Sequence, residues 1–185
     1  MPDLIRHLYK LDSGSAAGMT RSVLMDTKLK KFLDSNKIKY KLSEHKKVYT
    51  AFNEAETQHL KGKEVAKTVL IKADLPRLES GKAGKGFVLV VVPAVKHVDF
   101  AKVKKTLKAK KVSMAKESDI TKTLKTKVGL IHPFGNLYGL TVLIDNALLK
   151  QKSLVASPGS YTESMEFKPK DFLKLVEALK GSFSK

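Results

Sequence analysis

The sequence of 185 residues contains no cysteine. A chain without cysteine forms no disulfide framework, offers no thiolate nucleophile and cannot hold zinc or an iron–sulfur cluster through sulfur. The sequence also lacks any apolar run near the roughly 20 residues that cross a bilayer. These absences exclude disulfide-stapled, thiol-dependent and membrane-spanning proteins. They favour a soluble protein, and a cytoplasmic location fits them.

Acidic residues are scarce beside basic ones. Lysine and arginine number 36 against 18 for aspartate and glutamate, which gives a formal net charge of +18 at pH 7. Such a charge favours polyanions, so nucleic acid is the leading partner. The excess is greatest over residues 101–127, where ten lysines accompany two acidic residues. This run is either a solvated surface or a phosphate-binding face, and its lysines predict diffuse attraction rather than base reading.

The spacings of several catalytic motifs are missing as well. The histidines, at positions 7, 45, 59, 97 and 132, form neither a His-x-His nor a His-Glu-x-x-His pattern. The glycine-rich residues 81–86 lack the spacing of a phosphate-binding loop and precede a predicted strand. Ser157 stands in a Ser-Pro-Gly-Ser segment, which is not the Gly-x-Ser-x-Gly elbow of serine hydrolases. We therefore expect no metal, no cofactor and no serine triad.

Length and apolar content predict a single α/β domain. With 42% hydrophobic residues, the chain can bury one core, whereas two domains would each be small. Residues 1–24 include the stretch DSGSAAG, which resembles a vector-derived linker, and the native start would then be Met19 or Met25. We expect this leader to pack loosely and residues 25–185 to form the domain.

Hydrophobic periodicity predicts alternating helices and strands without an internal repeat. The strands at 65–73 and 87–92 should form an antiparallel hairpin with a mobile tip, because the loop between them is rich in glycine. Asn53 and Asp99 should each begin a helix, and Pro169 should lie in the first turn of the last one. The predicted fold is a mixed, mostly antiparallel β-sheet flanked by helices. Helices are predicted over 26–37, 53–62, 99–109, 118–125 and 169–181, and strands over 38–45, 65–73, 87–92, 112–115, 141–145, 153–156 and 161–167.

Two segments about sixty residues apart carry the strongest indication of function. Residues 65–72 read VAKTVLIK, and a lysine in such a strand must reach a rim, a pocket or an anion because the strand buries at least one face. Residues 129–135 read GLIHPFG. The glycine and proline allow this loop to expose backbone N–H groups that no ladder uses. Such a loop can hold a carbonyl or a phosphate.

Together these segments resemble the YbaK/ProX family of aminoacyl-tRNA editing domains, which also occurs as the insertion domain of bacterial-type prolyl-tRNA synthetases. Further matching segments are TAFNEA at 50–55, VVPA at 91–94, VDF at 98–100, ID at 144–145 and SPGS at 157–160. The resemblance extends from about residue 28 to residue 179. It implies hydrolysis of the ester bond of mischarged aminoacyl-tRNA, by positioning rather than by a triad. In the family the rejected substrates are small amino acids such as alanine or cysteine on tRNA for proline.

The resemblance also assigns roles to residues. Lys67 matches the family's essential lysine and would hold phosphate or ester oxygens, with a strand-edge lysine that reaches solvent as the alternative. Gly129 matches the first position of the Gly-x-x-x-Pro loop, whose N–H groups would bind the ester carbonyl, with an ordinary turn as the alternative. These two residues are the predicted catalytic pair, and Lys72 is the natural control. The residues expected to bind substrate are Thr50, Leu130, Ile131, His132, Pro133, Asp145, Ser157 and Gly159.

Two of these residues keep a second interpretation. His132 would either line the amino-acid pocket or only pack against Phe134. Asp145 is more typical of a strand-end carboxylate that bonds a neighbouring loop than of a pocket residue. The implied partners are tRNA and, as a second candidate, an aminoacyl-tRNA synthetase, and no membrane is expected. The residues expected to bind the acceptor stem are Lys102, Lys104, Lys105, Lys108 and Lys111.

Two other functions stay open. One is a non-catalytic tRNA-binding or synthetase-associated module of the same fold, although the retention of Lys67 and Gly129 argues against it. The other is a small-ligand-binding module with an incidental basic surface, whose activity would depend weakly on salt. Release of amino acid from a panel of mischarged tRNAs would distinguish these functions.

Overall fold

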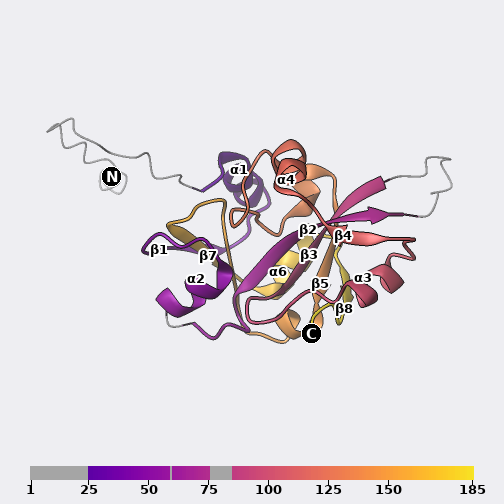
Figure 1. Cartoon of the computed structure of the whole chain (residues 1–185). Coiled ribbons are helices and arrows are strands. Elements are labelled where there is room, and N and C mark those ends of the chain that lie inside the picture. Colours follow the sequence, from indigo (N-terminus) through magenta and orange to yellow (C-terminus); the bar gives the residue numbers. More distant parts are fainter. Residues whose placement is uncertain (1–24, 59, 76–84) are drawn as a thin grey trace, which may run out of the picture.

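The computed structural model describes residues 25–58, 60–75 and 85–185 (Figure 1). The leader predicted over residues 1–24 and the tip of the predicted hairpin lie outside the described residues. The rest is a mixed α/β fold with two β-sheets and flanking helices, which confirms the predicted fold class. Within the described ranges, no helix combines the length and apolar character that a bilayer span requires.

The larger sheet has five strands in the order β4-β2-β3-β5-β8. The predicted hairpin is confirmed: β2 and β3 pair antiparallel, with Lys67 opposite Val92. β4 extends the sheet antiparallel to β2, whereas β5 and β8 add parallel strands beyond β3. Their bounds are β2 (Ala66–Asp74), β3 (Lys85–Pro93), β4 (Val112–Met114), β5 (Thr141–Asp145) and β8 (Leu179–Gly181).

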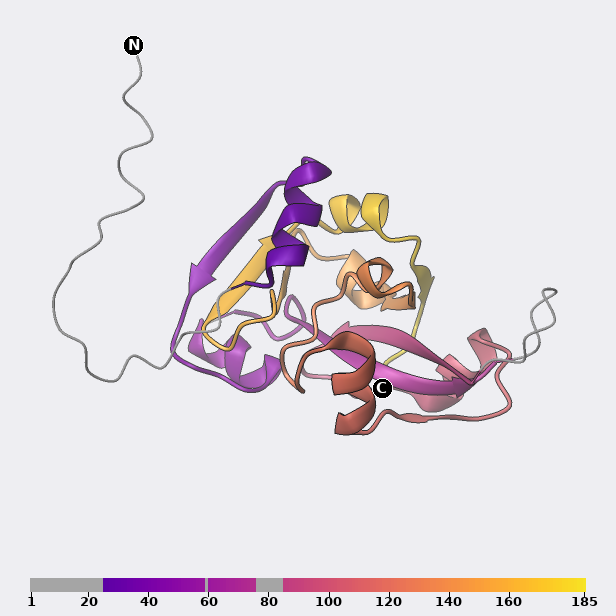
Figure 2. The ribbon, with the colours of Figure 1, turned by 90° about the horizontal axis from the view of Figure 1, so that it is seen from above.

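The smaller sheet has three antiparallel strands in the order β1-β7-β6. It lies beside the larger one in both views (Figures 1 and 2), and a parallel bridge between Val65 and Val155 joins the two. The sequence predicted these strands but assigned them to a single sheet, because pairing partners are not encoded in the local pattern of each strand. The bounds are β1 (Tyr40–Glu44), β6 (Leu154–Ala156) and β7 (Glu163–Phe167).

Most helices pack on one face of the larger sheet, and α3 packs on the other. Asp26 caps α1 and Asp99 caps α3, as the sequence predicted for Asp99, by accepting hydrogen bonds from backbone N–H groups of the first turn. Pro169 begins α6, also as predicted. The bounds are α1 (Thr27–Ser35), α2 (Ala51–Thr57), α3 (Phe100–Thr106), α4 (Glu117–Leu124), α5 (Asn146–Leu149), α6 (Pro169–Leu175) and the 3-10 helix η1 (Gly135–Tyr138).

Two predicted helices have wrong boundaries: the helix predicted over 53–62 differs at both ends, since α2 ends at Thr57, and the last helix differs at its end. α2 begins earlier than Asn53, because the hydroxyl of Thr50 accepts from the Asn53 N–H at 3.1 Å and starts the helix. The last helix ends at Leu175, since Val176 takes an extended conformation, and Leu179–Gly181 pairs with β5 as strand β8. Leu179 continues the apolar spacing of α6, so periodicity alone could not separate the two elements.

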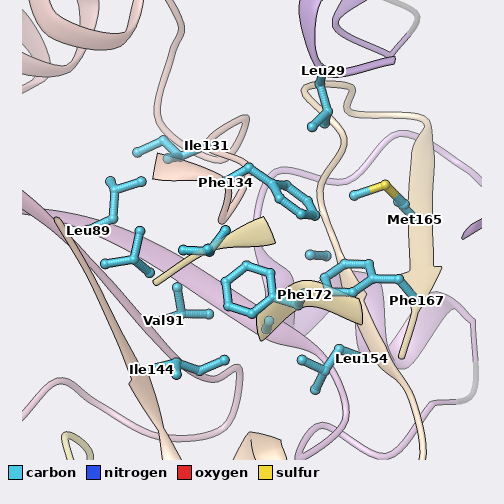
Figure 3. Close-up of a cluster of buried hydrophobic side chains, with 14 of the residues drawn as sticks. Leu29, Leu89, Val91, Ile131, Phe134, Ile144, Leu154, Met165, Phe167 and Phe172 are labelled. Carbon is cyan, nitrogen blue, oxygen red and sulfur yellow. The ribbon is translucent and has the colours of Figure 1, made fainter. Parts of the chain in front are cut away.

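Side chains of the larger sheet enter two cores. The main core lies under α1, α4 and α6 and includes Phe134, Phe167 and Phe172, whose ring centroids are 5.4 to 5.9 Å apart (Figure 3). The second core lies under α3 and contains Val92, Val103, Phe183 and neighbouring strand residues. Alternation along β2 and β3 divides their side chains between these cores. The face of the main core is the one on which the candidate site lies.

Candidate active site

A cavity lies where the outer edge of β2 is open. The carbonyls of Glu64 and Leu70 each accept a backbone hydrogen bond at 3.0 Å, the first from β6 and the second from the residue after β4. The backbone groups of Ala66 and Thr68 point to the same edge, because alternate residues of a strand do so. β4 pairs only with residues 71–73 of β2. A cavity of about 310 Å³ borders the stretch of β2 between these two hydrogen bonds.

The walls of this cavity come from five segments of the chain. They are the start of α2, strand β2, the β4–α4 connection with α4, the loop at 128–131 and the turn after β6. The lining is mostly apolar, as is typical of a small-molecule pocket with a few polar groups. Among the predicted site residues, the fold brings together Thr50, Lys67, Gly129, Ile131 and Ser157.

The loop around Gly129 forms one wall of the cavity. The φ of Gly129 is +85°, the left-handed region that glycine adopts without strain. Leu130 donates its N–H to the carbonyl of Lys127 at 3.1 Å, but within the described part of the chain the N–H groups of Gly129 and Ile131 have no acceptor. The buried side chains of Ile131 and Phe134 fix the loop in the main core. The loop therefore has the free donors that the sequence predicted for it.

Thr68 supplies a hydroxyl that the sequence analysis did not assign. It lies opposite Val91, whose side chain belongs to the main core, so Thr68 points toward the cavity face of the sheet. In the described ranges, its Oγ1 is the buried side-chain polar atom that has no hydrogen-bond partner. A buried hydroxyl without a partner costs stability, and Thr68 is one of the residues that line the cavity. Strand alternation next to Lys67 was the signal that could have identified it.

Lys67 borders the cavity but leaves β2 on the opposite face from Thr68. Its partner Val92 lies in the core under α3, and its ammonium donates to the carbonyls of Ala94 at 3.3 Å and Lys96 at 2.6 Å. Partial burial lowers the pKa of Lys67 below its ordinary value of 10.5. An ammonium has three N–H donors, so one remains for a ligand at the rim. The sequence predicted that this charge reaches a rim, a pocket or an anion, and the structure turns the ammonium toward the carbonyls of Ala94 and Lys96.

A second cavity, of about 290 Å³, lies beyond the Gly129 loop. It is bordered by three residues predicted to bind substrate: Leu130, His132 and Gly159. The ring of His132 is buried, stacks on Tyr138 and lies 2.9 Å from the tyrosine hydroxyl through Nε2. Its Nδ1 accepts from the N–H of Phe134 at 3.3 Å, so the neutral ring carries its proton on Nε2. Burial lowers the pKa of His132 to about 4.

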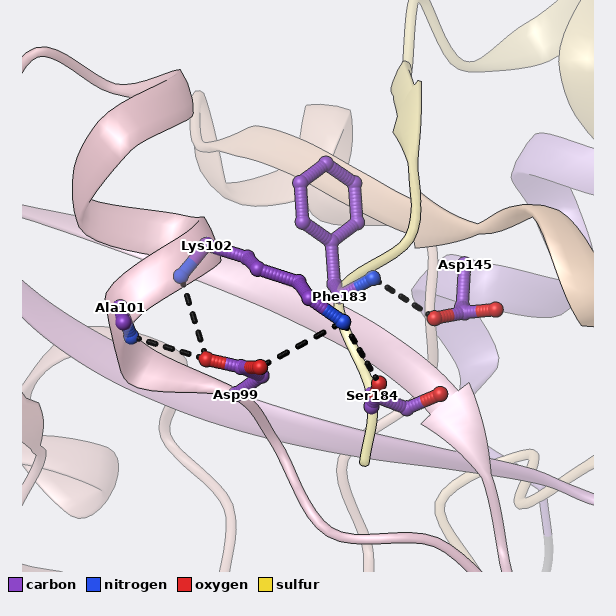
Figure 4. A network of polar contacts seen from close by, with 6 residues as sticks. All are labelled: Asp99, Ala101, Lys102, Asp145, Phe183 and Ser184. Atoms are coloured by element: carbon purple, nitrogen blue, oxygen red, sulfur yellow. Dashed lines mark hydrogen bonds and ion pairs between the residues drawn. The ribbon is translucent and has the colours of Figure 1, made fainter.

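Asp145 and Pro133 line neither cavity. The carboxylate of Asp145 accepts from the N–H of Ala147 at 2.8 Å and from that of Phe183 at 2.7 Å, so it fastens the C-terminal segment to β5 (Figure 4). This agrees with the interpretation of Asp145 as a strand-end carboxylate and separates it from the substrate pocket. Pro133 is buried beside the main-core residue Phe134.

The five lysines predicted to bind the acceptor stem lie on α3, which packs on the face of the larger sheet opposite the cavity, or in the connection from α3 to β4. α3 packs against the second core through Val103. Lys102 pairs with Asp99 at 3.4 Å and donates to the carbonyl of Ser184, also at 3.4 Å (Figure 4). The lysines of the same basic run that follow on α4 and its loop lie on the cavity side. The run is therefore divided by the sheet and is not one continuous face.

Comparison with known proteins agrees with this architecture. The aminoacyl-tRNA editing domain family matches residues 45–175. The chain is similar in fold to the crystal structure of hypothetical protein APE2540, with a TM-score of 0.74 and 18% identity over 85% of this chain and 99% of that one. It is also similar to a candidate trans-editing enzyme for prolyl tRNA synthetase, with a TM-score of 0.70 and 16% identity over 88% and 99%. Among curated proteins none matches.

The family match spans more than half of the chain and includes Lys67, the Gly129 loop and the turn at Ser157. The protein therefore belongs to the aminoacyl-tRNA editing domain family. This confirms the resemblance predicted from the sequence. The family supports an editing deacylase in general terms.

Proposed function

We propose that this protein hydrolyses the ester bond of mischarged aminoacyl-tRNA. The observation that carries the proposal is the cavity itself: it is lined by Gly129 and Ile131, whose backbone N–H groups have no acceptor among the described residues, and by Thr68. Donors fixed by the fold and aimed at one point stabilise the oxyanion that forms when an ester carbonyl is attacked. Membership of the editing-domain family supports this ester as the substrate.

In this mechanism the protein positions the reacting groups. The ester carbonyl accepts from the Gly129 loop, Thr68 packs against the aminoacyl group, and the remaining Lys67 donor holds an oxygen of the substrate. The hydroxyl of Ser157 borders the cavity and accepts from the N–H of Gly159 at 3.3 Å. None of the described histidines lines this cavity. The attacking group is therefore a water molecule or a hydroxyl of the substrate, activated by position.

The substrate we propose is a small amino acid, such as alanine or cysteine, on tRNA for proline. A cavity of about 310 Å³ with apolar walls suits a short side chain beside a ribose. The similarity in fold to a candidate trans-editing enzyme for prolyl tRNA synthetase supports the choice of tRNA. An aminoacyl-tRNA synthetase is the second partner in this proposal, and the reaction belongs in the cytoplasm, where tRNA is charged.

Mischarged tRNAs test the proposal directly. Alanyl-, cysteinyl-, seryl- and prolyl-tRNA for proline are incubated with the protein, and released amino acid is followed against a reaction without protein. We expect release of alanine or cysteine and little release of proline. Tight binding of all four without release would support the non-catalytic module instead. Equal rates of release for all four amino acids would contradict the proposed selectivity.

Lys67 provides the first prediction. Lys67→Met keeps the aliphatic stem and removes the charge, and we expect deacylation to fall by about a hundredfold because a donor at the reacting end is lost. Lys72→Met is the matched control, since Lys72 lies five residues further along the same strand and its ammonium packs over the Phe87 ring. Thermal unfolding of both variants separates lost activity from the lost bonds to Ala94 and Lys96. Equal, small effects on activity would contradict the role of Lys67.

A further inference from the structure

Two tyrosines lie between the two cavities. Tyr49 borders the first cavity and Tyr161 borders the second, and their ring centroids are 4.9 Å apart. Tyr49 is 56% exposed, so a large part of this aromatic residue faces solvent. Exposed aromatic rings next to a pocket are typical of a surface that receives another flat ring. These two residues are called the tyrosine platform below.

The platform is held in place by the loops around it. The hydroxyl of Tyr161 donates to the carbonyl of Val128 at 3.0 Å, so the ring is tied to the residue before Gly129. The N–H of Val48 donates to the carbonyl of Tyr161 at 2.9 Å, which fixes the approach to Tyr49. Lys47 places its ammonium 5.3 Å from the Tyr49 centroid and 6.0 Å from the Tyr161 centroid. The rings are thus preorganised and carry a positive charge at their edge.

Basic groups continue on the far side of the platform. The second cavity is bordered by Lys125 and Lys127, both exposed, and by Tyr138. Lys125 ends α4 in the left-handed conformation, with φ +55°, and its N–H donates to the carbonyl of Thr121. Asp26 also borders this cavity, but its carboxylate accepts from the N–H groups of Lys28 and Leu29 as the cap of α1. The cavity therefore combines two exposed cations with one carboxylate that caps a helix.

We propose that the single-stranded 3′ end of an RNA crosses the tyrosine platform from the first cavity to the second. One base stacks on Tyr49, and Lys125 and Lys127 hold the phosphate that precedes it in the second cavity. Aromatic rings flanked by cations bind single strands in this manner, with little dependence on base identity. The inference rests on the proposed function, because the first cavity then receives the aminoacyl group at the end of that strand.

The test uses an uncharged RNA hexamer that ends in CCA and carries a fluorophore at its 5′ end. Its affinity for the full chain is measured by fluorescence anisotropy over a series of salt concentrations. We expect Tyr49→Ala to weaken binding by roughly tenfold, as the loss of one base-stacking contact would. Replacing Lys125 and Lys127 by Gln should weaken binding and reduce the salt slope by about 1 to 2.

Matched controls make the result specific. Lys104 and Lys105 carry the same charges on the opposite face of the sheet, so their replacement by Gln should change the affinity by less than about twofold. Tyr161→Phe keeps the ring and removes one hydroxyl, so most of the affinity should remain. Circular dichroism verifies that each variant is folded.

The outcomes separate this inference from the proposed function. Unchanged affinity in Tyr49→Ala, an equal loss in the two lysine pairs, or no binding of the hexamer to the wild type would each overturn the inference. If deacylation of mischarged tRNA is nevertheless observed, the proposed function stands without the platform. If the hexamer depends on Tyr49 and Lys125 but no ester is hydrolysed, the RNA-end site stands and the protein is a binding module.

Discussion

Only glycine fits at position 129. A Cβ atom there would lie 2.5 Å from the carbonyl oxygen of Tyr49, and the φ of +85° would be strained for any other residue. The carbonyl belongs to the segment that leads into α2, so the Gly129 loop and the start of α2 pack backbone against backbone. The wall of the cavity depends on this close approach.

We therefore expect Gly129→Ala to displace the loop and to lower the deacylation rate by about a hundredfold, because the free N–H groups leave their position. The fold should remain, since the loop is otherwise fixed by its buried side chains. Gly139→Ala is the control: it has a positive φ of +64°, but its Cβ would meet nothing within 4 Å. Deacylation assays on both variants test the expected loss of activity, and circular dichroism tests whether the fold remains. Wild-type rates in Gly129→Ala would place the substrate elsewhere.

His132 makes a prediction about acid stability. Its pKa is about 4 in the folded chain and near 6.5 in the unfolded chain, so between these values only the unfolded chain binds the proton. The contribution of this residue to stability is therefore complete above pH 6.5 and is lost as the pH falls toward 4. The difference between the two pKa values corresponds to about 3 kcal/mol in the free energy of unfolding.

Urea unfolding at pH 7 and pH 4.5 should show a smaller acid loss in His132→Gln than in the wild type. His97→Gln makes the same substitution at an exposed position and is the matched control. Identical acid losses in the wild type and His132→Gln would mean that the ring is accessible to solvent. His132 borders the second cavity and not the first, so we do not expect it to determine which amino acid is released.

Among the elements, β8 depends on a contact far away in the sequence. Phe183 is buried in the core under α3, and its N–H donates to Asp145 at the end of β5. A Cβ at Gly181 would meet the Phe183 ring at 2.6 Å, so the chain can pass this ring only without a side chain there. The C-terminal segment is therefore a structural part of the larger sheet.

Asp145→Ala should lower the free energy of unfolding by about 3 kcal/mol, because two backbone donors lose a charged acceptor. The folded variant should keep the wild-type deacylation rate, since Asp145 does not line the first cavity. Asp171→Ala is the control: its carboxylate makes one exposed pair with Lys174 at 3.3 Å, and such pairs contribute at most about 1 kcal/mol. If Asp145→Ala lost activity without losing stability, Asp145 would take part in the substrate site.

At the scale of the whole molecule, the division of the basic run by the larger sheet determines which lysines face a bound tRNA. Four exposed lysines at 104, 105, 108 and 111 lie on or after α3, and four at 116, 122, 125 and 127 lie on α4 or directly beside its ends. Replacing either set by Gln removes the same charge. The two sets therefore form a matched pair of variants.

We expect the α4 set to reduce the salt slope of full-length tRNA binding by up to about 3, and the α3 set by less than about 1. The reason is that only the first set lies on the cavity side, within reach of the acceptor stem. Binding measured by filter retention over a salt series tests this. A larger effect of the α3 set would mean that the stem crosses α3, as the sequence first predicted.

The sequence by itself determined the class of fold, the family and most of the local elements. Periodicity and turn residues identified the β2–β3 hairpin, the Asp99 cap and the start of α6, because each of these depends on residues close together in the chain. The Gly-x-x-x-Pro spacing also predicted that the loop at Gly129 leaves backbone N–H groups without an acceptor, as holds among the described residues.

Only the tertiary structure decided what faces the cavity. The opening in β2 exists because β6 and β4, which are distant in sequence, pair with it on either side of residues 66–69. That arrangement places Thr68 inside, Lys67 at the rim and Asp145 elsewhere. It also separates the lysines of one basic run onto two faces. Long-range pairing fixes these positions, and no local pattern encodes it.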